Sequence, residues 1–126
     1  MAGRKIKILI VEDEAILAFC LQRILRELGA TVLGPVARGE KAVDVALKEK
    51  PSLILMDIRL AGEMDGIETA RKILSHHKIP VVFISGYVTE GVKEKALKLK
   101  PVAFLEKPLF IPHVKNIIND LMNEQV

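Results

Sequence analysis

The chain has no tryptophan, one cysteine and few aromatic residues, which make up 4% of its 126 positions. Cys20 has no partner for an internal disulfide, so we expect a fold that is stable without one, as is typical of cytoplasmic proteins. No apolar run approaches the roughly 18 residues that a membrane span requires. The short apolar stretch after Lys7 ends at Glu12, which argues against a secretory signal. We therefore expect a cytoplasmic protein that does not enter a membrane.

What the chain does contain is enough apolar sequence for a core: half of the residues are hydrophobic and 28% are charged. The length is that of one ordinary domain, so we expect residues 1–126 to form a single domain. The net charge of +3 is unevenly distributed. Residues 12–14 are all acidic, whereas residues 91–115 contain six lysines and two glutamates. This separation of charge is the first indication of a functional site.

Short apolar segments alternate five times with segments of helical periodicity. This alternation predicts parallel strands joined by helices, and uninterrupted apolar strands predict helices on both faces of the sheet. The expected fold is a three-layer α/β/α sandwich around a five-stranded parallel sheet. We expect the strands at residues 5–11, 31–33, 53–56, 81–84 and 102–105, and the helices at residues 14–28, 39–50, 65–77, 90–99 and 112–123.

Polar side chains follow four of the predicted strands. Glu12 and Asp13 follow the first strand, Asp57 the third and Ser85 the fourth, and Lys107 comes just after the fifth. The carboxyl ends of parallel strands meet at one edge of a sheet, so these side chains should converge. Any one of them could instead cap the next helix or be solvated. Capping is a poor explanation for all of them together.

The expected site combines three carboxylates with one ammonium, which leaves a charge of −2 that a divalent cation would balance. Oxygen ligands without cysteine or histidine favour a hard ion such as Mg²⁺. A carboxylate can also act as a nucleophile toward a phosphoryl group. Mg²⁺, Lys107 and Ser85 would then stabilise the phosphoryl oxygens. The residues therefore predict a Mg²⁺-dependent phosphoryl site with Asp57 as the acceptor.

Five motifs occur in a fixed order: ILIVEDE at residues 8–14, LMDI at 55–58, MDGIE at 64–68, VFISG at 82–86 and AFLEKPL at 103–109. Together they resemble the receiver domain of response regulators in two-component signal transduction systems, over residues 5–121. The resemblance is to single-domain, chemotaxis-regulator-like members. It implies a flavodoxin-like (βα)5 fold with strand order 2-1-3-4-5.

The resemblance also implies roles for individual residues. Asp57 would be the phosphoacceptor. It would receive a phosphoryl group from a phosphohistidine on a sensor histidine kinase or histidine phosphotransfer protein. Asp13 would bind Mg²⁺ directly, Glu12 would bind it directly or through water, and the backbone carbonyl of Arg59 would be a further ligand beside Asp57. Phosphorylation would make the chain a phosphoprotein that carries an aspartyl phosphate.

A conformational switch is the second implication of the resemblance. Ser85 and Lys107 would contact the phosphoryl oxygens, and Ser85 and Phe104 would move together on phosphorylation. Pro108 would follow Lys107 through a cis peptide bond. The signal would reach the surface of the fourth helix, fifth strand and fifth helix. There it would be read by an effector protein or output domain, or by a second copy in a homodimer.

Two features depart from the common pattern of the family. The loop at residues 58–66 is one residue longer than in many members and lacks their Met-Pro pair. Phe104 stands where tyrosine is commoner, and its ring has no hydroxyl to hydrogen-bond outward. We therefore expect any switch to depend on ring packing.

Three other functions stay open. A phosphatase or phosphotransferase with an aspartyl-phosphate intermediate would have a second aspartate where this chain has Arg59. A flavin domain of the same fold would need a loop of small polar residues after the first strand to bind the flavin phosphate. This chain has three acids there, at residues 12–14, and they would repel a phosphate. A receiver-like binding module that is never phosphorylated would not need the complete set of acids, Ser85 and Lys107. We expect the protein to assist its own phosphorylation and dephosphorylation but not to act as an enzyme. It would be either a stand-alone relay protein or part of a longer regulator.

The remaining reactive residues are expected to be structural. His76 and His77 face different directions on a helix, so they make a poor chelate. Cys20 is expected to pack as a small apolar residue. The lysines at 93, 95, 98 and 100 have no aromatic residue among them for stacking on bases. They predict a solvated face or a docking surface for an acidic partner, and no direct binding of nucleic acid.

Overall fold

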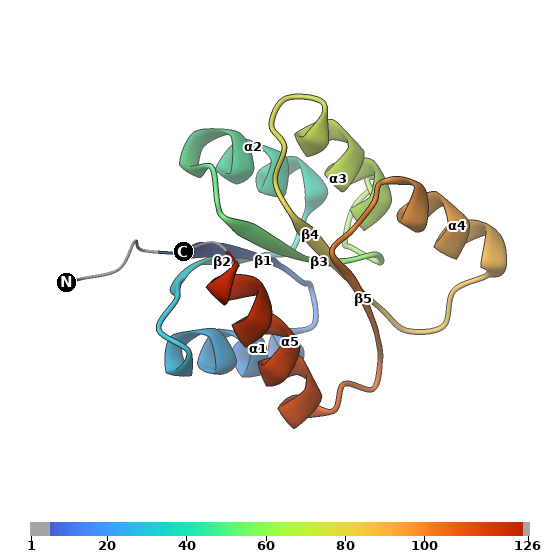
Figure 1. Cartoon of the computed structure of the whole chain (residues 1–126). Coiled ribbons are helices and arrows are strands. Elements are labelled where there is room, and N and C mark those ends of the chain that lie inside the picture. The colour runs from blue at the N-terminus through green and yellow to red at the C-terminus, as the bar shows by residue number, and fades with distance from the viewer. Residues whose placement is uncertain (1–5, 125–126) are drawn as a thin grey trace.

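Five parallel strands form one sheet in the order β2-β1-β3-β4-β5, in a computed structural model that describes residues 6–124 (Figure 1). This order and the layered α/β architecture confirm the predicted fold class. The strands are β1 (Lys7–Val11), β2 (Thr31–Val36), β3 (Leu53–Asp57), β4 (Val81–Ser85) and β5 (Ala103–Glu106).

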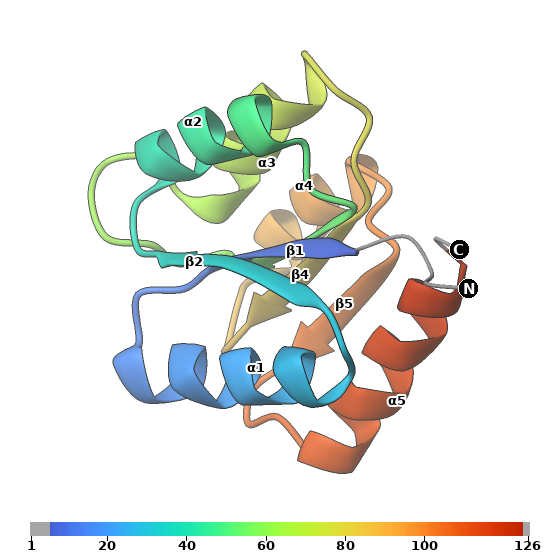
Figure 2. The same ribbon diagram turned by 90° about the vertical axis from the view of Figure 1, so that its left-hand side faces the viewer.

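The helices cover both faces of the sheet (Figures 1 and 2). On one face lie α1 (Ala15–Glu27) and α5 (Ile111–Asn123), and on the other lie α2 (Gly39–Glu49), α3 (Gly66–Leu74) and α4 (Glu90–Lys98). None of the helices within residues 6–124 has the length and apolar character to cross a membrane.

Alternate residues of the strands supply two separate cores. In β3, Leu55 packs toward α1 and α5, whereas Ile54 and Met56 pack toward α2, α3 and α4. Every residue of β3 and β4 is buried. Burial on both faces explains why these strands read as continuous apolar runs. It also fixes the carboxyl ends of β3 and β4, where the polar side chains emerge.

Strand β2 is longer than predicted, because it continues to Val36 and the sequence pattern ended it at residue 33. Gly34 permits this extension, since its φ is +87° and a Cβ there would lie 2.8 Å from the Ile10 carbonyl oxygen. The Gly34–Pro35 peptide bond is cis. Past this point Val36 pairs with Val11, and its carbonyl accepts from the Glu12 N–H at 2.9 Å.

Other boundaries also differ from the prediction. Strand β1 begins at Lys7, and the predicted start at Lys5 lies outside the described residues. Helix α3 ends at Leu74, three residues before the predicted end, and the chain then tightens into a turn in which the His76 N–H donates to the Ile73 carbonyl three residues back. Cys20 is half-buried on α1, where it lines a small cavity with residues of α5.

Candidate functional site

The polar residues predicted to converge do lie at one edge of the sheet. In the register of the parallel strands, Val11 pairs with Met56, Asp57 with Ile84, and Ser85 with Glu106. The residues that follow or end these strands are therefore neighbours. The most direct sign is a 2.8 Å contact between Lys107 Nζ and Asp57 Oδ2, across 50 residues of sequence.

Asp57 is held by both carboxylate oxygens. It is 2% exposed at the end of β3. Its Oδ1 accepts from the Arg59 N–H at 3.0 Å, and its Oδ2 accepts from Lys107. The carboxylate borders a cavity of about 370 Å³ that Arg59, Tyr87 and Lys107 also line. Asp57 is thus fixed in position and reachable from one side.

Lys107 joins three acidic side chains. Its Nζ lies 2.8 Å from Asp57, 2.9 Å from Glu14 and 3.8 Å from Glu12. Burial by itself lowers the pKa of Lys107, but its hydrogen bonds to Asp57 and Glu14 outweigh this and raise that pKa above its usual range. Lys107 is therefore charged at neutral pH. Glu14 was not predicted as a site residue, and its only signal was its place in the acidic run at residues 12–14.

Glu12 carries an unsatisfied buried oxygen. The residue is 3% exposed, and its Oε2 accepts from the Glu14 N–H at 3.0 Å. Its Oε1 lies 3.8 Å from Lys107 Nζ, too far for a hydrogen bond, and has no hydrogen-bond partner within residues 6–124. Burial, followed by the adjacent Asp57 carboxyl group, raises the pKa of Glu12 to about 8. A buried carboxylate oxygen without a donor is well suited to a cation.

An acidic cluster completes this edge of the sheet. Glu12, Asp13 and Asp57 can each place one carboxylate oxygen within 4.8 Å of the others. Glu12 and Asp57 are buried, whereas Asp13 is exposed. Three carboxylates at this spacing could hold one hard divalent cation such as Mg²⁺. The Arg59 side chain is exposed, and its backbone adjoins the cluster through the N–H that binds Asp57.

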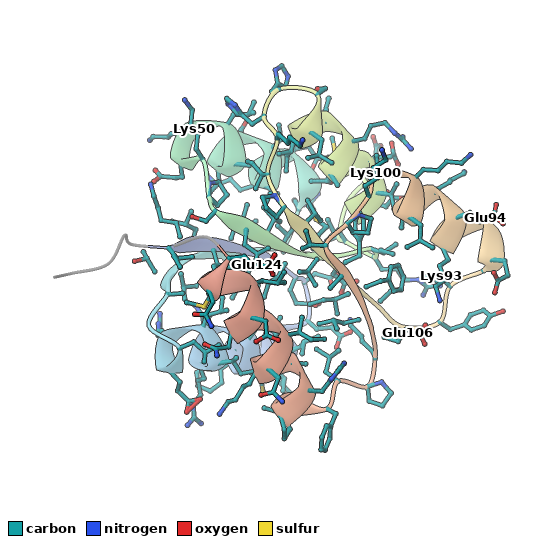
Figure 3. All side chains as sticks on the ribbon, viewed as in Figure 1. Lys50, Lys93, Glu94, Lys100, Glu106 and Glu124 are labelled. Carbon is teal, nitrogen blue, oxygen red and sulfur yellow. The ribbon has the colours of Figure 1, made fainter. Side chains whose placement is uncertain are left out.

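Of the two residues expected to form the switch, Ser85 ends β4 and Phe104 lies within β5. Ser85 is 1% exposed, and its hydroxyl donates to the Gly86 carbonyl at 3.1 Å. Phe104 is half-buried on β5, and the centroid of its ring lies 6.5 Å from that of Phe83. Lys93 Nζ lies 5.4 Å from the centroid of the Phe104 ring. Figure 3 shows Lys93 reaching from α4 toward Glu106, with which it forms an ion pair at 3.3 Å. The Lys107–Pro108 peptide bond is cis, as expected.

The raised pKa of Glu12 predicts that Mg²⁺ binding depends on pH. Below about pH 8 Glu12 is mostly protonated, so a bound cation must displace its proton. The apparent Mg²⁺ affinity should therefore rise by up to about tenfold per pH unit between about pH 6 and pH 8. Calorimetric titration at several pH values measures this slope.

A Glu12→Gln variant serves as the control for this titration. It removes the titrating group, so its Mg²⁺ affinity should be weaker and much less dependent on pH. Wild-type affinity that stays constant over this range would show that Glu12 is already ionised without the cation.

The sequence and the fold of this chain are similar to those of known proteins. The response regulator receiver domain family matches residues 8–119. Transcriptional regulatory protein PdtaR of Mycobacterium tuberculosis is 34% identical over 105 residues, which cover 83% of this chain and 51% of that protein. The chain thus spans about half the length of this relative.

Two solved structures share the fold. The signal receiver domain of a modulated diguanylate cyclase from Desulfovibrio desulfuricans has a TM-score of 0.86 and 31% identity, with 97% of each chain covered. The receiver domain of a sensor histidine kinase from Pseudomonas aeruginosa, with a magnesium ion coordinated in its active-site cleft, has a TM-score of 0.82 and 28% identity. That match covers 95% of this chain and 99% of the other. The chain belongs to the family of response regulator receiver domains of two-component systems.

Proposed function

We propose that residues 1–126 form one receiver domain that acts as the phosphoacceptor of a two-component or phosphorelay system, with Asp57 as the accepting residue. The proposal is carried by one observation: the buried Asp57 carboxylate lies against the Lys107 ammonium and beside an acidic cluster that contains an unsatisfied oxygen. The site offers a nucleophile, one fixed cation and ligands for a second. These are the parts that phosphoryl transfer requires.

The acidic cluster fits Mg²⁺ as the cofactor. Glu12, Asp13 and Asp57 would hold the ion through carboxylate oxygens, and the backbone carbonyl of Arg59 would be a further ligand. When bound, Mg²⁺ would neutralise negative charge on the phosphoryl oxygens. The magnesium ion in the Pseudomonas aeruginosa receiver domain supports the same cofactor here.

In the proposed transfer, an Asp57 carboxylate oxygen attacks the phosphorus of a phosphohistidine on a sensor histidine kinase or histidine phosphotransfer protein. A P–O bond forms as the P–N bond breaks, and the imidazole leaves with the electron pair and takes up a proton. Lys107 would then pair with a phosphoryl oxygen, and the Ser85 hydroxyl would turn from Gly86 toward another. Hydrolysis of the acyl phosphate restores Asp57. We propose no enzymatic activity beyond this assistance.

The signal would leave through the surface formed by α4, β5 and α5. The Lys107 N–H donates to the Ser85 carbonyl at 2.7 Å, so β5 is tied to the residue that would reorient. Rotation of Ser85 would free space for the Phe104 ring and shift the populations of two conformations. A downstream effector protein, an output domain or a second copy would read the change. The proposed setting is the cytoplasm, without nucleic-acid or membrane contact.

Acetyl phosphate with Mg²⁺ tests this proposal without a partner protein. Intact-mass spectrometry should show the gain of one phosphoryl group in the wild-type chain. The gain should disappear in Asp57→Ala and when EDTA removes Mg²⁺. Asp120→Ala, which removes an exposed acid on α5, should react like the wild type. Equal phosphorylation of Asp57→Ala would exclude Asp57 as the acceptor.

A further inference from the structure

A groove of about 520 Å³ runs between α3 and α4, away from Asp57. Figures 1 and 2 show the two helices side by side on the same face of the sheet. Apolar side chains line it: Ile67 from α3, Val92 from α4, and Leu99 from the end of α4. A space of this size takes several side chains, not a single ion.

Basic residues line the groove from both helices. Arg71 belongs to α3, and Lys95 and Lys98 belong to α4, where a spacing of three residues puts them on one side of the helix. All three are exposed. Within residues 6–124, none of them forms an ion pair. Unpaired cations that face one another across a groove favour an anionic occupant.

Two acidic residues line the same groove, at the beginning of α3. Asp65 caps the helix, since its side chain accepts from the Glu68 N–H at 2.8 Å. Glu68 adds a second carboxylate at the first turn of α3. A polyphosphate backbone carries a charge at every nucleotide and would have to pass these carboxylates, whereas a peptide can place its carboxylates opposite the basic residues alone. None of the groove's lining residues is aromatic, so bases have nothing to stack on. The groove therefore suits an acidic peptide better than a nucleic acid.

The groove continues toward the edge of the sheet. A neighbouring cavity of about 240 Å³ shares Asp65 and Val92 with it. The same cavity shares Arg59 and Tyr87 with the cavity beside Asp57. The groove between α3 and α4 is therefore connected to the loops around Asp57 by a row of adjoining cavities.

We propose that the groove between α3 and α4 docks an extended segment of a partner protein that combines acidic and apolar residues. Its apolar side chains would cover the partly exposed Val92 and Leu99, and its carboxylates would pair with the basic residues on both walls. Docking of this kind does not require a phosphoryl group on Asp57. The proposal therefore stands or falls separately from the phosphoacceptor function.

The test uses a fluorescent synthetic peptide in which glutamate and leucine alternate, with a second peptide in which glutamine replaces glutamate. Fluorescence anisotropy with the full unphosphorylated chain should show binding of the acidic peptide and about tenfold weaker binding of the glutamine peptide at low salt. Amide NMR shifts caused by the acidic peptide should cluster on α3 and α4.

Charge-reversal variants locate the binding site. The double variant Lys95→Glu/Lys98→Glu should weaken binding of the acidic peptide by about tenfold, since each exposed ion pair contributes little alone. Arg71→Gln tests the opposite wall and covers the case in which the double variant fails to fold. The matched control Lys41→Glu/Lys48→Glu makes the same charge change on α2, outside the groove, and should bind like the wild type.

Three results would overturn the proposal. One is the absence of binding of the acidic peptide to the wild-type chain. Another is equal weakening by the α2 control, which would indicate attraction to net charge alone. The third is displacement of the peptide by a single-stranded oligonucleotide at lower concentration than by unlabelled peptide, which would identify the groove as a nucleic-acid site.

Discussion

Replacing Lys107 with alanine should slow phosphorylation of Asp57 by about 10²–10³-fold, the usual effect of removing one fixed donor to a charged transition state. The Lys107 side chain is 19% exposed and contacts Asp57, Glu14 and Glu12. Without it, the phosphoryl group would approach carboxylates that no other described side chain neutralises within ion-pair distance. The initial rate of mass gain with acetyl phosphate at fixed Mg²⁺ measures the effect.

A second lysine provides the matched control for this variant. Lys115 pairs with Glu27 at 3.3 Å, but the two side chains are 40% and 53% exposed and neither lines the cavity beside Asp57. Surface pairs of this kind contribute little, so Lys115→Ala should change the rate by less than about twofold. Lys107→Ala that reacts at the wild-type rate would show that the 2.8 Å contact with Asp57 has no part in the transfer.

Replacing Gly66 with alanine should destabilise the fold by about 1–3 kcal/mol, the typical cost of overpacking. Gly66 begins α3, and its N–H donates to the Ile58 carbonyl at 2.7 Å. A methyl group there would overlap the main-chain oxygen of Asp57 and crowd Ile58 Cα. Because both obstacles are backbone, either the end of β3 or the start of α3 must move. The variant should therefore also phosphorylate more slowly. Urea unfolding measures the change in stability.

Gly86 offers a control at the same edge of the sheet. A Cβ on Gly86 would meet no heavy atom within 4 Å, so Gly86→Ala should change stability by less than about 0.5 kcal/mol. Equal stability of Gly66→Ala and Gly86→Ala would mean that α3 can be displaced from Asp57 at no cost. The close packing of α3 on β3 would then have no role in positioning the site.

The fold could be predicted from the sequence because its strands are buried on both faces and its helices are amphipathic. A continuous apolar run such as residues 81–84 must be covered on both faces of the sheet, which requires a layer of helices on each side. The convergence of Asp57 and Lys107 followed from the same pattern, since each comes at or just after the end of a strand in a parallel sheet. Backbone topology alone places these residues.

What the sequence did not reveal depends on tertiary contacts and rotamers. The predicted second strand ended at residue 33, but pairing with β1 extends β2 to Val36. Glu14 contacts Lys107, which lies 93 residues later in the chain. The local sequence does not indicate that Glu14, and not Asp13, makes this contact. The direction of the Ser85 hydroxyl toward Gly86 is likewise set by its surroundings. These contacts and side-chain rotamers are determined by groups that are distant in sequence and meet only in the folded chain.

Locating the phosphoryl group is the most direct measurement of the phosphoacceptor function. Borohydride reduces an acyl phosphate to an alcohol, so an aspartyl phosphate becomes homoserine, which peptide mass spectrometry identifies by position. After reaction with acetyl phosphate and Mg²⁺, homoserine should appear at position 57 alone, and not in the Asp57→Ala chain or with EDTA. A phosphoryl group found on Glu12, Asp13 or Ser85, or one that persists in Asp57→Ala, would contradict the assignment of Asp57 as the phosphoacceptor.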